Sequence, residues 1–396
     1  MSRQTEAIKG PWRVGFVFDD TLDVLDGVQQ HILTLGRELT ARGHRVEYLV
    51  GQTTDPPVSG VHSLARNIMV SFNGNRMRVP IHAPARGIRQ VLDSGHFDIL
   101  HVQAPYSPLM AGRVINRAHP GTGLVATYHI APTGPMQLFG GRVLGRINHH
   151  SHRRIDRVIA VSTVAADYAR TTAGVDSRVI PNPIDLQAIR ASRERAGGAT
   201  IDRLHGRGPH MVFLGRFVER KGADLLISAI EEGERLGLFP EGFHVTMAGK
   251  GALLASCRQH ARDLSTPIDF PGFVKEEDKP ALLASADLAV FPSTGGESFG
   301  IVLLEAIASG AGVVLAGDNP GYRSTLLDDD QALVVVNAPQ TPTILARRIA
   351  RVFSDTDWAG AIHGRQVGLL DRYDVRTVAN QIEEVYGQAV EDRLIM

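Results

Sequence analysis

A glycine-rich stretch at residues 295–306, GGESFGIVLLEA, carries two carboxylates that could contact a phosphorylated sugar. Its glycines let the backbone approach a ligand closely, and Ser298 is the expected N-cap of a helix. The unpaired N–H groups and positive dipole of a helix start favour an anion such as phosphate. Glu297 lies in the loop, and Glu305, about two turns farther on, can accept hydrogen bonds from sugar hydroxyls. The glycines and the apolar strand before them favour a site over a core helix with incidental glutamates.

Two cations follow an apolar strand earlier in the chain. Arg216 and Lys221 come directly after residues 211–215, at the expected carboxyl end of that strand. Two surface cations are usually just solvated, but at a strand end they could bind a diphosphate, with Arg as a bidentate donor and Lys as a point charge. Fixed cations at this place can stabilise the negative charge that develops on a departing phosphate without a metal ion.

The strands that must position these residues alternate with helical patterns in both halves of the chain. The first half opens with a strand at 13–18, a helix at 28–42 and a strand at 43–50, without the G-x-G-x-x-G fingerprint of dinucleotide binding. This alternation predicts parallel α/β sheets, whose ligands bind outside the carboxyl ends of the strands. The other expected strands are 97–102, 123–129, 157–162, 211–215, 243–249, 268–273, 288–291 and 312–316.

The chain is long enough, at 396 residues, for two ordinary domains. Residues 180–185 contain two prolines and are interpreted as a hinge. We therefore predict a first domain at 1–182, joined by a helix at about 374–396, and a second domain at 183–373. The Arg- and Gly-rich residues 192–209 are expected to form a loop.

The composition argues against several classes of protein. Lys plus Arg and Asp plus Glu number 42 each, which argues against a dedicated nucleic-acid binder. One cysteine, Cys257, excludes an intramolecular disulfide and fits a reducing cytosol. The sequence shows no signal peptide and no apolar run long enough to span a bilayer. We expect a cytoplasmic protein whose membrane contact, if it has one, is peripheral.

Three polar runs could be considered as metal ligands, and we predict no metal site at any of them. Asp19–Asp20 and Asp328–Asp330 lack a partner His or carboxylate at a defined spacing. The run His149–His152, with arginines on both sides, is interpreted as the polar face of a helix.

The stretch GGESFGIVLLEA resembles the donor-sugar loop of family-4 retaining glycosyltransferases, which have the GT-B fold. Within that family the chain is most similar to the phosphatidylinositol mannosyltransferases of actinobacteria, and the likeness extends from Val14 to about Tyr386. The resemblance implies two Rossmann-like domains facing a central cleft, and a C-terminal helix that crosses back to the first domain. It places the acceptor in the first domain and a nucleotide-sugar donor in the second.

The resemblance also assigns roles to individual residues. It implies that His129 lies beside the donor sugar, and that Val274 contacts the nucleotide base through its backbone. The residues implied in catalysis are His129, Arg216, Lys221 and Glu297. Those implied in donor binding are Gly27, Arg216, Lys221, Val274, Glu297, Ser298, Phe299, Gly300, Ile301 and Glu305.

The favoured donor, by resemblance, is GDP-mannose, and a UDP-sugar stays open because base selection depends on loop geometry. No tightly bound cofactor is implied, and Mg²⁺ is compatible with the sequence without being required by it. Glu297 is the one carboxylate we place near the anomeric carbon. The departing phosphate oxygen is then expected to take the acceptor proton. A nucleotide-sugar 2-epimerase of similar fold and a sugar-nucleotide-binding protein are the alternatives, and the set of charged residues argues against the second.

The acceptor side follows the family pattern only in part. Residues 72–78 and 86–92 resemble the region that lipid-acceptor mannosyltransferases press against a bilayer. Asp20 stands where those enzymes carry an aromatic residue, and Ile130 stands where a hydroxyl residue is expected. We therefore expect weak, salt-sensitive binding to anionic lipid and a glycolipid acceptor other than phosphatidylinositol, with a soluble acceptor as the alternative. The implied acceptor or membrane residues are Asp20, Gln29, Asn73, Arg78, Arg86 and Arg89.

Overall fold

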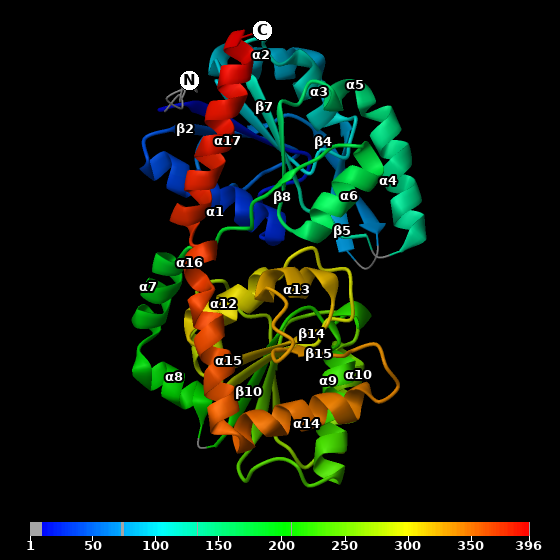
Figure 1. Ribbon diagram of the computed structural model, residues 1–396, viewed down its shortest axis with the longest axis vertical. Helices are drawn as coiled ribbons and strands as arrows, with labels where there is room; N and C mark the ends of the chain where they lie inside the picture. Colours follow the sequence, from blue (N-terminus) through cyan, green and yellow to red (C-terminus); the bar gives the residue numbers. More distant parts are fainter. Residues whose placement is uncertain (1–9, 73–74, 133, 207, 396) are drawn as a thin grey trace, which may run out of the picture. The chain divides into compact units, whose positions relative to one another are not determined.

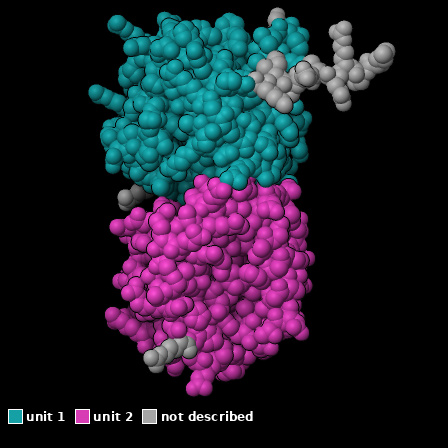
Figure 2. All heavy atoms as spheres, turned by 90° about the vertical axis from the view of Figure 1, so that its left-hand side faces the viewer, with its two compact units in different colours: residues 1–183, 375–396 teal, residues 184–374 magenta. Residues whose placement is uncertain are grey.

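The computed structural model describes residues 10–72, 75–132, 134–206 and 208–395. The chain divides into two compact units (Figures 1 and 2). Unit 1 comprises Met1–Pro183 together with Val375–Met396, and unit 2 comprises Ile184–Asp374. Each unit is built on its own parallel sheet, which confirms the expected α/β class.

Unit 1 contains a seven-stranded sheet with the order β3-β2-β1-β6-β7-β8-β9. All neighbouring strands in it run parallel. The strands β6 and β7 are buried along their whole length, as expected for a sheet covered on both faces. The strands are β1 (Arg13–Phe18), β2 (Arg45–Val50), β3 (Val61–Ser63), β6 (Ile99–Gln103), β7 (Gly123–Tyr128), β8 (Arg157–Ala160) and β9 (Arg178–Val179).

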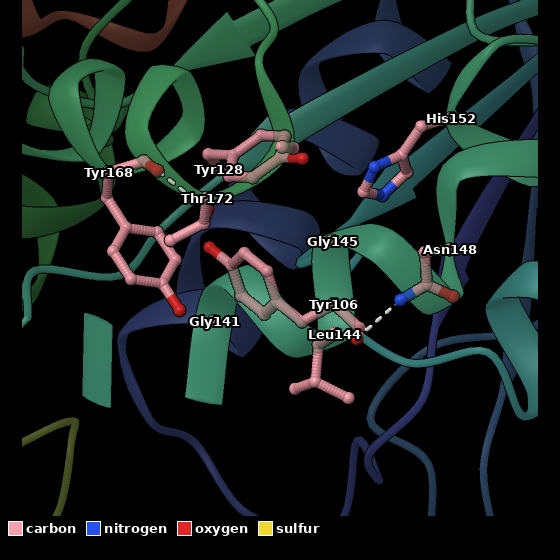
Figure 3. A pocket seen from close by; sticks show the side chains of 10 residues that line it. Tyr106, Tyr128, Gly141, Leu144, Gly145, Asn148, His152, Tyr168 and Thr172 are labelled. Carbon is pink, nitrogen blue, oxygen red and sulfur yellow. Dashed lines mark hydrogen bonds between the residues drawn. The ribbon is translucent and has the colours of Figure 1, made fainter. Parts of the chain in front are cut away.

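The helices of unit 1 flank this sheet (Figure 1). They are α1 (Gly27–Ala41), α2 (Ala85–Gly95), α3 (Met110–Arg117), α4 (Pro135–Ile147), α5 (His149–His152), α6 (Thr163–Ala173) and α17 (Val375–Ile395). α4 packs against α6, next to a small cavity of about 10 Å³ lined by residues that include Tyr106, Tyr128 and Tyr168 (Figure 3). An antiparallel hairpin outside the sheet, β4 (Arg66–Phe72) and β5 (Asn75–His82), was not predicted from the sequence.

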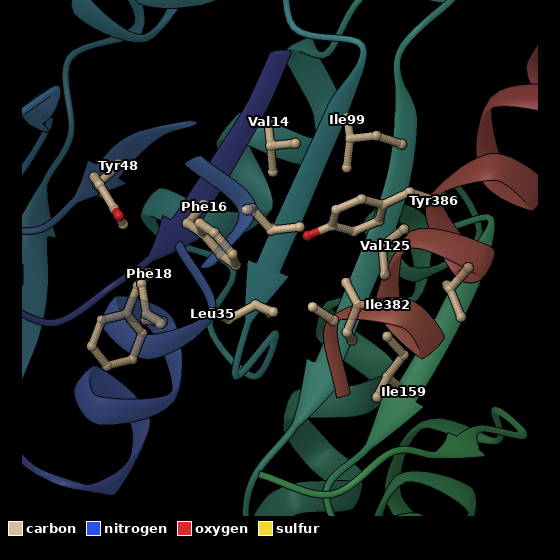
Figure 4. Packing of buried hydrophobic residues seen from close by; sticks show 14 of the residues in the cluster. Val14, Phe16, Phe18, Leu35, Tyr48, Ile99, Val125, Ile159, Ile382 and Tyr386 are labelled. Carbon is tan, nitrogen blue, oxygen red and sulfur yellow. The ribbon is translucent and has the colours of Figure 1, made fainter. Parts of the chain in front are cut away.

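The C-terminal helix α17 completes the core of unit 1. Its residues Ile382 and Tyr386 are fully buried against Phe16 of β1 and Val125 of β7 (Figure 4). The hydroxyl of Tyr386 also lies 2.9 Å from Nδ1 of the buried His101. The prediction that the last helix returns to the first domain is confirmed.

Unit 2 contains a six-stranded sheet with the order β12-β11-β10-β13-β14-β15, again parallel throughout. Its strands are β10 (His210–Leu214), β11 (His244–Ala248), β12 (Ile268–Gly272), β13 (Leu288–Phe291), β14 (Val313–Gly317) and β15 (Leu333–Val334). Its helices are α7 (Leu186–Ala196), α8 (Gly198–His205), α9 (Ala223–Arg235), α10 (Leu254–Ala261), α11 (Lys279–Ala284), α12 (Ile301–Ser309), α13 (Pro320–Leu326), α14 (Thr341–Ser354), α15 (Thr356–Gly368) and α16 (Leu370–Tyr373), with a 3₁₀ turn at Glu219–Lys221.

The loop expected at residues 192–209 is wrong, because α7 and α8 occupy most of it. The carboxylate of Asp185 accepts a hydrogen bond from the backbone N–H of Ala188 and caps α7. The hydroxyl of Ser192 donates to the backbone carbonyl of Glu277 and ties the helix to the chain before α11. Capping and packing therefore outweigh the loop-like composition.

Candidate functional site

Glu297 is the centre of a charged cluster in the loop between β13 and α12. Its Oε1 lies 2.7 Å from Nη1 of Arg220 and 2.8 Å from Nζ of Lys221. The hydroxyl oxygen of Ser293 lies 2.9 Å from the same Oε1. The 3₁₀ turn after β10 supplies both cations, and the end of β13 supplies the serine. Neighbouring parallel strands thus bring together residues far apart in the sequence.

The cluster is mostly withdrawn from water, since the Glu297 side chain is only 13% exposed and that of Lys221 18% exposed. Burial alone would raise the pKa of Glu297, but the charges of Lys221 and Arg220 outweigh burial and lower it. Burial lowers the pKa of Lys221, and the Glu297 carboxylate opposes this effect. Each charge therefore holds its buried partner in the ionised form.

The backbone of the loop depends on two glycines. Gly296 has φ of +70°, in the left-handed region that glycine tolerates best. A Cβ atom on Gly300 would lie 2.7 Å from the Tyr322 ring, so no larger residue fits without displacing that side chain. The predicted cap at Ser298 is wrong: Gly300 is the N-cap of α12, and no side chain caps this helix start.

The remaining donor residues implied by the resemblance, apart from Gly27, lie at one edge of the unit 2 sheet or in α12. Arg216 follows β10 and is close enough to Lys221 for its charge to lower the pKa of that lysine. Val274 follows β12. Ile301 begins α12, and Glu305 lies half-buried within it. Phe299 is buried, with its ring 5.6 Å from that of Tyr373, so its side chain belongs to the core.

Two members of the charged cluster were missed by the sequence analysis. Arg220 stands between Glu219 and Lys221 and looks like one residue of a solvated charge run. Ser293 lies two residues after the end of the apolar strand β13 and carries no motif of its own. The signal that could have found both was their place at the carboxyl ends of adjacent strands.

Unit 1 contains a second polar cluster, built from neutral side chains. His129 follows β7 and is buried, with Nε2 2.7 Å from the amide oxygen of Gln103 at the end of β6. The ring of His31, from α1, lies edge-on at a centroid distance of 4.9 Å from that of His129. Nδ1 of His31 lies 2.9 Å from the amide oxygen of Asn182.

The environment keeps these histidines uncharged. Burial lowers the pKa of His31 to about 4, and burial together with His31 and His101 lowers the pKa of His129 well below its usual value. Because an amide oxygen can only accept, His129 Nε2 and His31 Nδ1 are donors, and the other nitrogen of each neutral ring is an acceptor. Among the described residues, Nε2 of His31 is buried without a hydrogen-bond partner. The cluster can therefore accept hydrogen bonds from hydroxyl groups.

The residues implied on the acceptor side are only partly brought together. Asp20 Oδ2 accepts a hydrogen bond from the backbone N–H of Arg78, at 3.2 Å. The buried amide of Gln29 donates to the backbone carbonyl of Thr21, next to Asp20. Gly27 begins α1. Arg86 and Arg89 are exposed on α2, and Asn73 lies outside the described residues.

The polar runs considered as metal ligands have structural roles. Asp329 pairs with Arg365, and Asp330 pairs with Arg323. His152 is buried and donates from Nε2 to the backbone carbonyl of Pro105, so it does not belong to an exposed polar face. Within the described residues, no three His, Cys, Asp or Glu side chains form a group that could hold a metal ion. Among these residues there is also no helix with the length and hydropathy needed to cross a membrane.

Comparisons with known proteins agree with the fold. Residues 25–188 match the sequence profile of Glycosyltransferase Family 4, and residues 202–362 match that of Glycosyl transferases group 1. The chain is 32% identical over 383 residues to a Mycobacterium tuberculosis protein named phosphatidyl-myo-inositol mannosyltransferase, covering 94% of this chain and 96% of the relative. A Propionibacterium freudenreichii protein of the same name is 35% identical over 340 residues, 81% of each chain.

A solved structure shows the same architecture. The chain superposes on Anabaena HepE, in complex with UDP and glucose, with a TM-score of 0.66 at 18% identity, covering 94% of this chain and 98% of the other. At that identity the likeness establishes the GT-B fold alone. Together with the curated relatives and the matched profiles, it shows that this chain belongs to the family-4 glycosyltransferases and is a hexosyltransferase.

Proposed function

We propose that this glycosyltransferase moves a mannosyl group from GDP-mannose to a phosphatidylinositol-type lipid. The observation that carries the proposal is the buried cluster of Glu297, Arg220 and Lys221 at the carboxyl edge of the unit 2 sheet. The choice of mannose and of lipid is supported by the names of the relatives, which are 32% and 35% identical to this chain.

In this proposal the donor diphosphate binds Arg216 and Lys221, whose positive charges stabilise the leaving group as the glycosidic bond breaks. The backbone N–H groups at the start of α12 contribute the positive end of the helix dipole. The contacts of Glu297 described above converge on Oε1, so Oε2 is the oxygen that accepts from sugar hydroxyls. Glu305 accepts hydrogen bonds from the ribose hydroxyls.

The transfer is proposed to be retaining, with the departing phosphate oxygen taking the proton of the acceptor hydroxyl. A double displacement would instead need a nucleophile on the opposite face of the sugar. Glu297 is held by two cations and is suited to orienting hydroxyls rather than to attacking carbon. The neutral His129 in turn is proposed to accept a hydrogen bond from a donor-sugar hydroxyl.

A donor and acceptor panel tests the function. GDP-mannose, GDP-glucose, UDP-glucose and UDP-galactose are each incubated with the enzyme, with and without phosphatidylinositol vesicles, and both free nucleotide and glycolipid are measured. We expect acceptor-dependent GDP release and one mannosylated lipid, both abolished by Glu297→Gln. If the enzyme prefers a UDP-sugar, the assignment of GDP-mannose as the donor is wrong. If the donor sugar is isomerised in the absence of an acceptor, the protein is an epimerase.

The lipid acceptor has its own test, because Asp20 stands where the relatives' family carries an aromatic residue. Mannosylated phosphatidylinositol and unmodified phosphatidylinositol are offered at equal concentration in detergent micelles. Transfer to phosphatidylinositol supports the proposal. Transfer only to the mannosylated lipid would contradict the proposal that unmodified phosphatidylinositol is the acceptor. A glycolipid would then be the favoured acceptor, because the carboxylate of Asp20 can accept hydrogen bonds from sugar hydroxyls.

A further inference from the structure

Helix α4 presents large apolar side chains to solvent. Met136 is 86% exposed, Phe139 69% and Ile147 59%, and Val143 between them is 39% exposed. Their positions differ by three or four residues, so they share one face of the helix. A helix of a globular protein normally buries such a stripe, because exposing it forgoes the free energy of burial.

The face of α4 that packs against unit 1 is made of glycine instead. Gly141 is the buried residue of the helix, and an added Cβ there would lie 2.5 Å from the Tyr168 hydroxyl of α6. An added Cβ on Gly145 would lie 2.0 Å from the backbone oxygen of Thr172 (Figure 3). The two glycines let α4 lie directly on α6. The close contact fixes the helix with its apolar stripe directed away from the unit.

The charged residues of α4 and α5, and of the chain just after them up to Ile155, are all basic. Arg142 and Arg146 are exposed on α4 itself, and Arg153 is exposed just after α5. Residues 99–155 contain no Asp or Glu. The acidic residue of α6, Asp167, is paired with Arg170. An exposed apolar stripe bordered by arginines is complementary to a surface that is apolar inside and negative outside.

Helix α2, which the sequence resemblance favoured for membrane contact, lacks this combination. Its apolar residues Ile88 and Leu92 are buried in the core of unit 1. Arg86 and Arg89 are exposed, but Asp93 on the same helix reduces their net charge. α2 can therefore offer charge to a membrane but no apolar side chain of its own to insert.

We propose that α4 is the helix through which this enzyme docks on an anionic lipid bilayer, with Met136, Phe139 and Ile147 inserted at the headgroup boundary. The inference rests on the proposed lipid acceptor, because an acceptor that stays in the membrane requires the enzyme to reach that surface. A second copy of this chain fits the stripe less well, since two such surfaces would bring their arginines together.

Vesicle sedimentation tests the docking without donor or turnover. The enzyme is mixed with phosphatidylcholine vesicles, or with vesicles that also contain phosphatidylglycerol, at 50 mM and 500 mM NaCl. We expect pelleting only with the anionic vesicles at low salt, because screening weakens the arginine contacts. Met136→Ser/Phe139→Ser and Arg142→Gln/Arg146→Gln should each weaken partitioning about tenfold or more.

Matched control variants distinguish binding through α4 from nonspecific adsorption of the protein to vesicles. Leu394→Ser/Ile395→Ser removes two apolar side chains of similar exposure at the end of α17, 73% and 78%, and should leave partitioning unchanged. Arg86→Gln/Arg89→Gln removes the same charge from α2 and should have an effect of threefold or less. A larger effect from α2 than from α4 would overturn the assignment.

A fluorescent reporter tests insertion directly. Phe139→Trp should shift its emission to the blue and be quenched by brominated lipid when anionic vesicles are added, whereas Leu394→Trp should not respond. An unresponsive Phe139→Trp, or a dimer that Met136→Ser/Phe139→Ser dissociates in light scattering, would overturn the membrane proposal. Vesicle binding without mannosylation of any lipid would refute the proposed function alone, and transfer in micelles without vesicle binding would refute the docking alone.

Discussion

The buried polar clusters of the two units differ in charge: the cluster in unit 2 is ionised, and the cluster in unit 1 is neutral. In unit 2, Glu297 is ionised and held by Lys221 and Arg220. In unit 1, His129 and His31 are kept neutral by burial and contact the amide oxygens of Gln103 and Asn182. A buried charge needs a counter-charge, whereas a neutral imidazole needs only hydrogen bonds.

This difference in charge determines which kind of ligand each cluster can bind. A set of fixed positive charges suits a diphosphate, whose charge grows as it leaves. A set of neutral acceptors suits hydroxyl groups, which carry no charge and would gain nothing from a cation. Charge substitutions should therefore have larger effects in unit 2 than in unit 1.

The largest effect is expected from Glu297→Leu. It leaves Lys221 and Arg220 buried without their counter-charge, and breaking a buried pair in this way typically costs about 3–5 kcal/mol of stability. Thermal unfolding of the unit 2 transition should report this loss, together with transferase activity below about 10⁻³ of the original. Asp330→Leu, which removes a mostly exposed partner of Arg323, is the control and should cost about 1 kcal/mol or less. Equal stability of the two variants would contradict the cluster as a buried unit.

Arg216→Ala is expected to lower kcat by about 10²–10³, because it removes one fixed donor to the developing phosphate charge. Glu305→Gln, in the same unit, should instead raise the KM for the donor with kcat nearly unchanged, since ribose contacts are made equally in the ground state. Steady-state kinetics with varied donor distinguishes the two patterns. Unchanged kinetics in Arg216→Ala would refute the diphosphate assignment.

Gln103→Glu turns the neutral cluster of unit 1 into a charged one. The new carboxylate beside Nε2 should raise the pKa of His129 by about 1–3 units, as opposite charges at this distance do. Titration of the His129 ring by nuclear magnetic resonance measures the change, and we expect activity to fall only several-fold. Gln103→Met is the neutral control. A His129 pKa that is the same in both variants would show that the Gln103 contact does not govern the protonation of this ring.

The last effect is absent at neutral pH and concerns His31. Burial lowers the pKa of His31 in the folded chain from its usual value of 6.5 to about 4, so between these values the unfolded chain binds a proton that the folded chain does not. The free energy of unfolding should therefore fall as pH drops from 6.5 towards 4, by about 1.4 kcal/mol per unit from this group. Because Asp19 has its pKa raised to about 6 and acts in the opposite direction, the measurement is the difference between the wild type and His31→Gln. If the difference in unfolding free energy between the wild type and His31→Gln does not change with pH, the lowered pKa of His31 is contradicted.

Much of the fold was predictable because the strands are apolar runs. Residues 13–18 and 288–291 form strands with the predicted bounds. The helix predicted after the glycine-rich loop is present, but it begins at Ile301, two residues later than a cap at Ser298 implies. The hairpin β4–β5 was missed because it lies outside the parallel sheets and its strands are not continuous apolar runs, since β5 contains Arg76, Arg78 and Pro80. The cap at Ser298 was wrong because Gly300 takes that position against Tyr322.

The candidate sites were predictable only where a motif stands out in the sequence. Glu297 and Lys221 were found, but their contact depends on β10 and β13 being neighbours in the sheet, which no local pattern encodes. Arg220 and Gln103 were missed for the same reason, since each acquires its partner only through strand pairing or a turn. The exposed stripe of α4 was hidden because its pattern is that of an ordinary amphipathic helix. Only the glycine contacts with α6 show which face is outside.

The return of α17 to unit 1 sets the order in which the two units can mature on the ribosome. Unit 1 takes its first 183 residues from the start of the chain and its last helix from residues 375–396, whereas unit 2 is continuous. Every residue of unit 2 is thus synthesised before Ile382 and Tyr386 become available to cover the unit 1 sheet. The domain that begins first is completed last, against the usual N-terminal-first order. A chain that ends before Val375 would keep unit 2 whole and leave unit 1 with an uncovered apolar face.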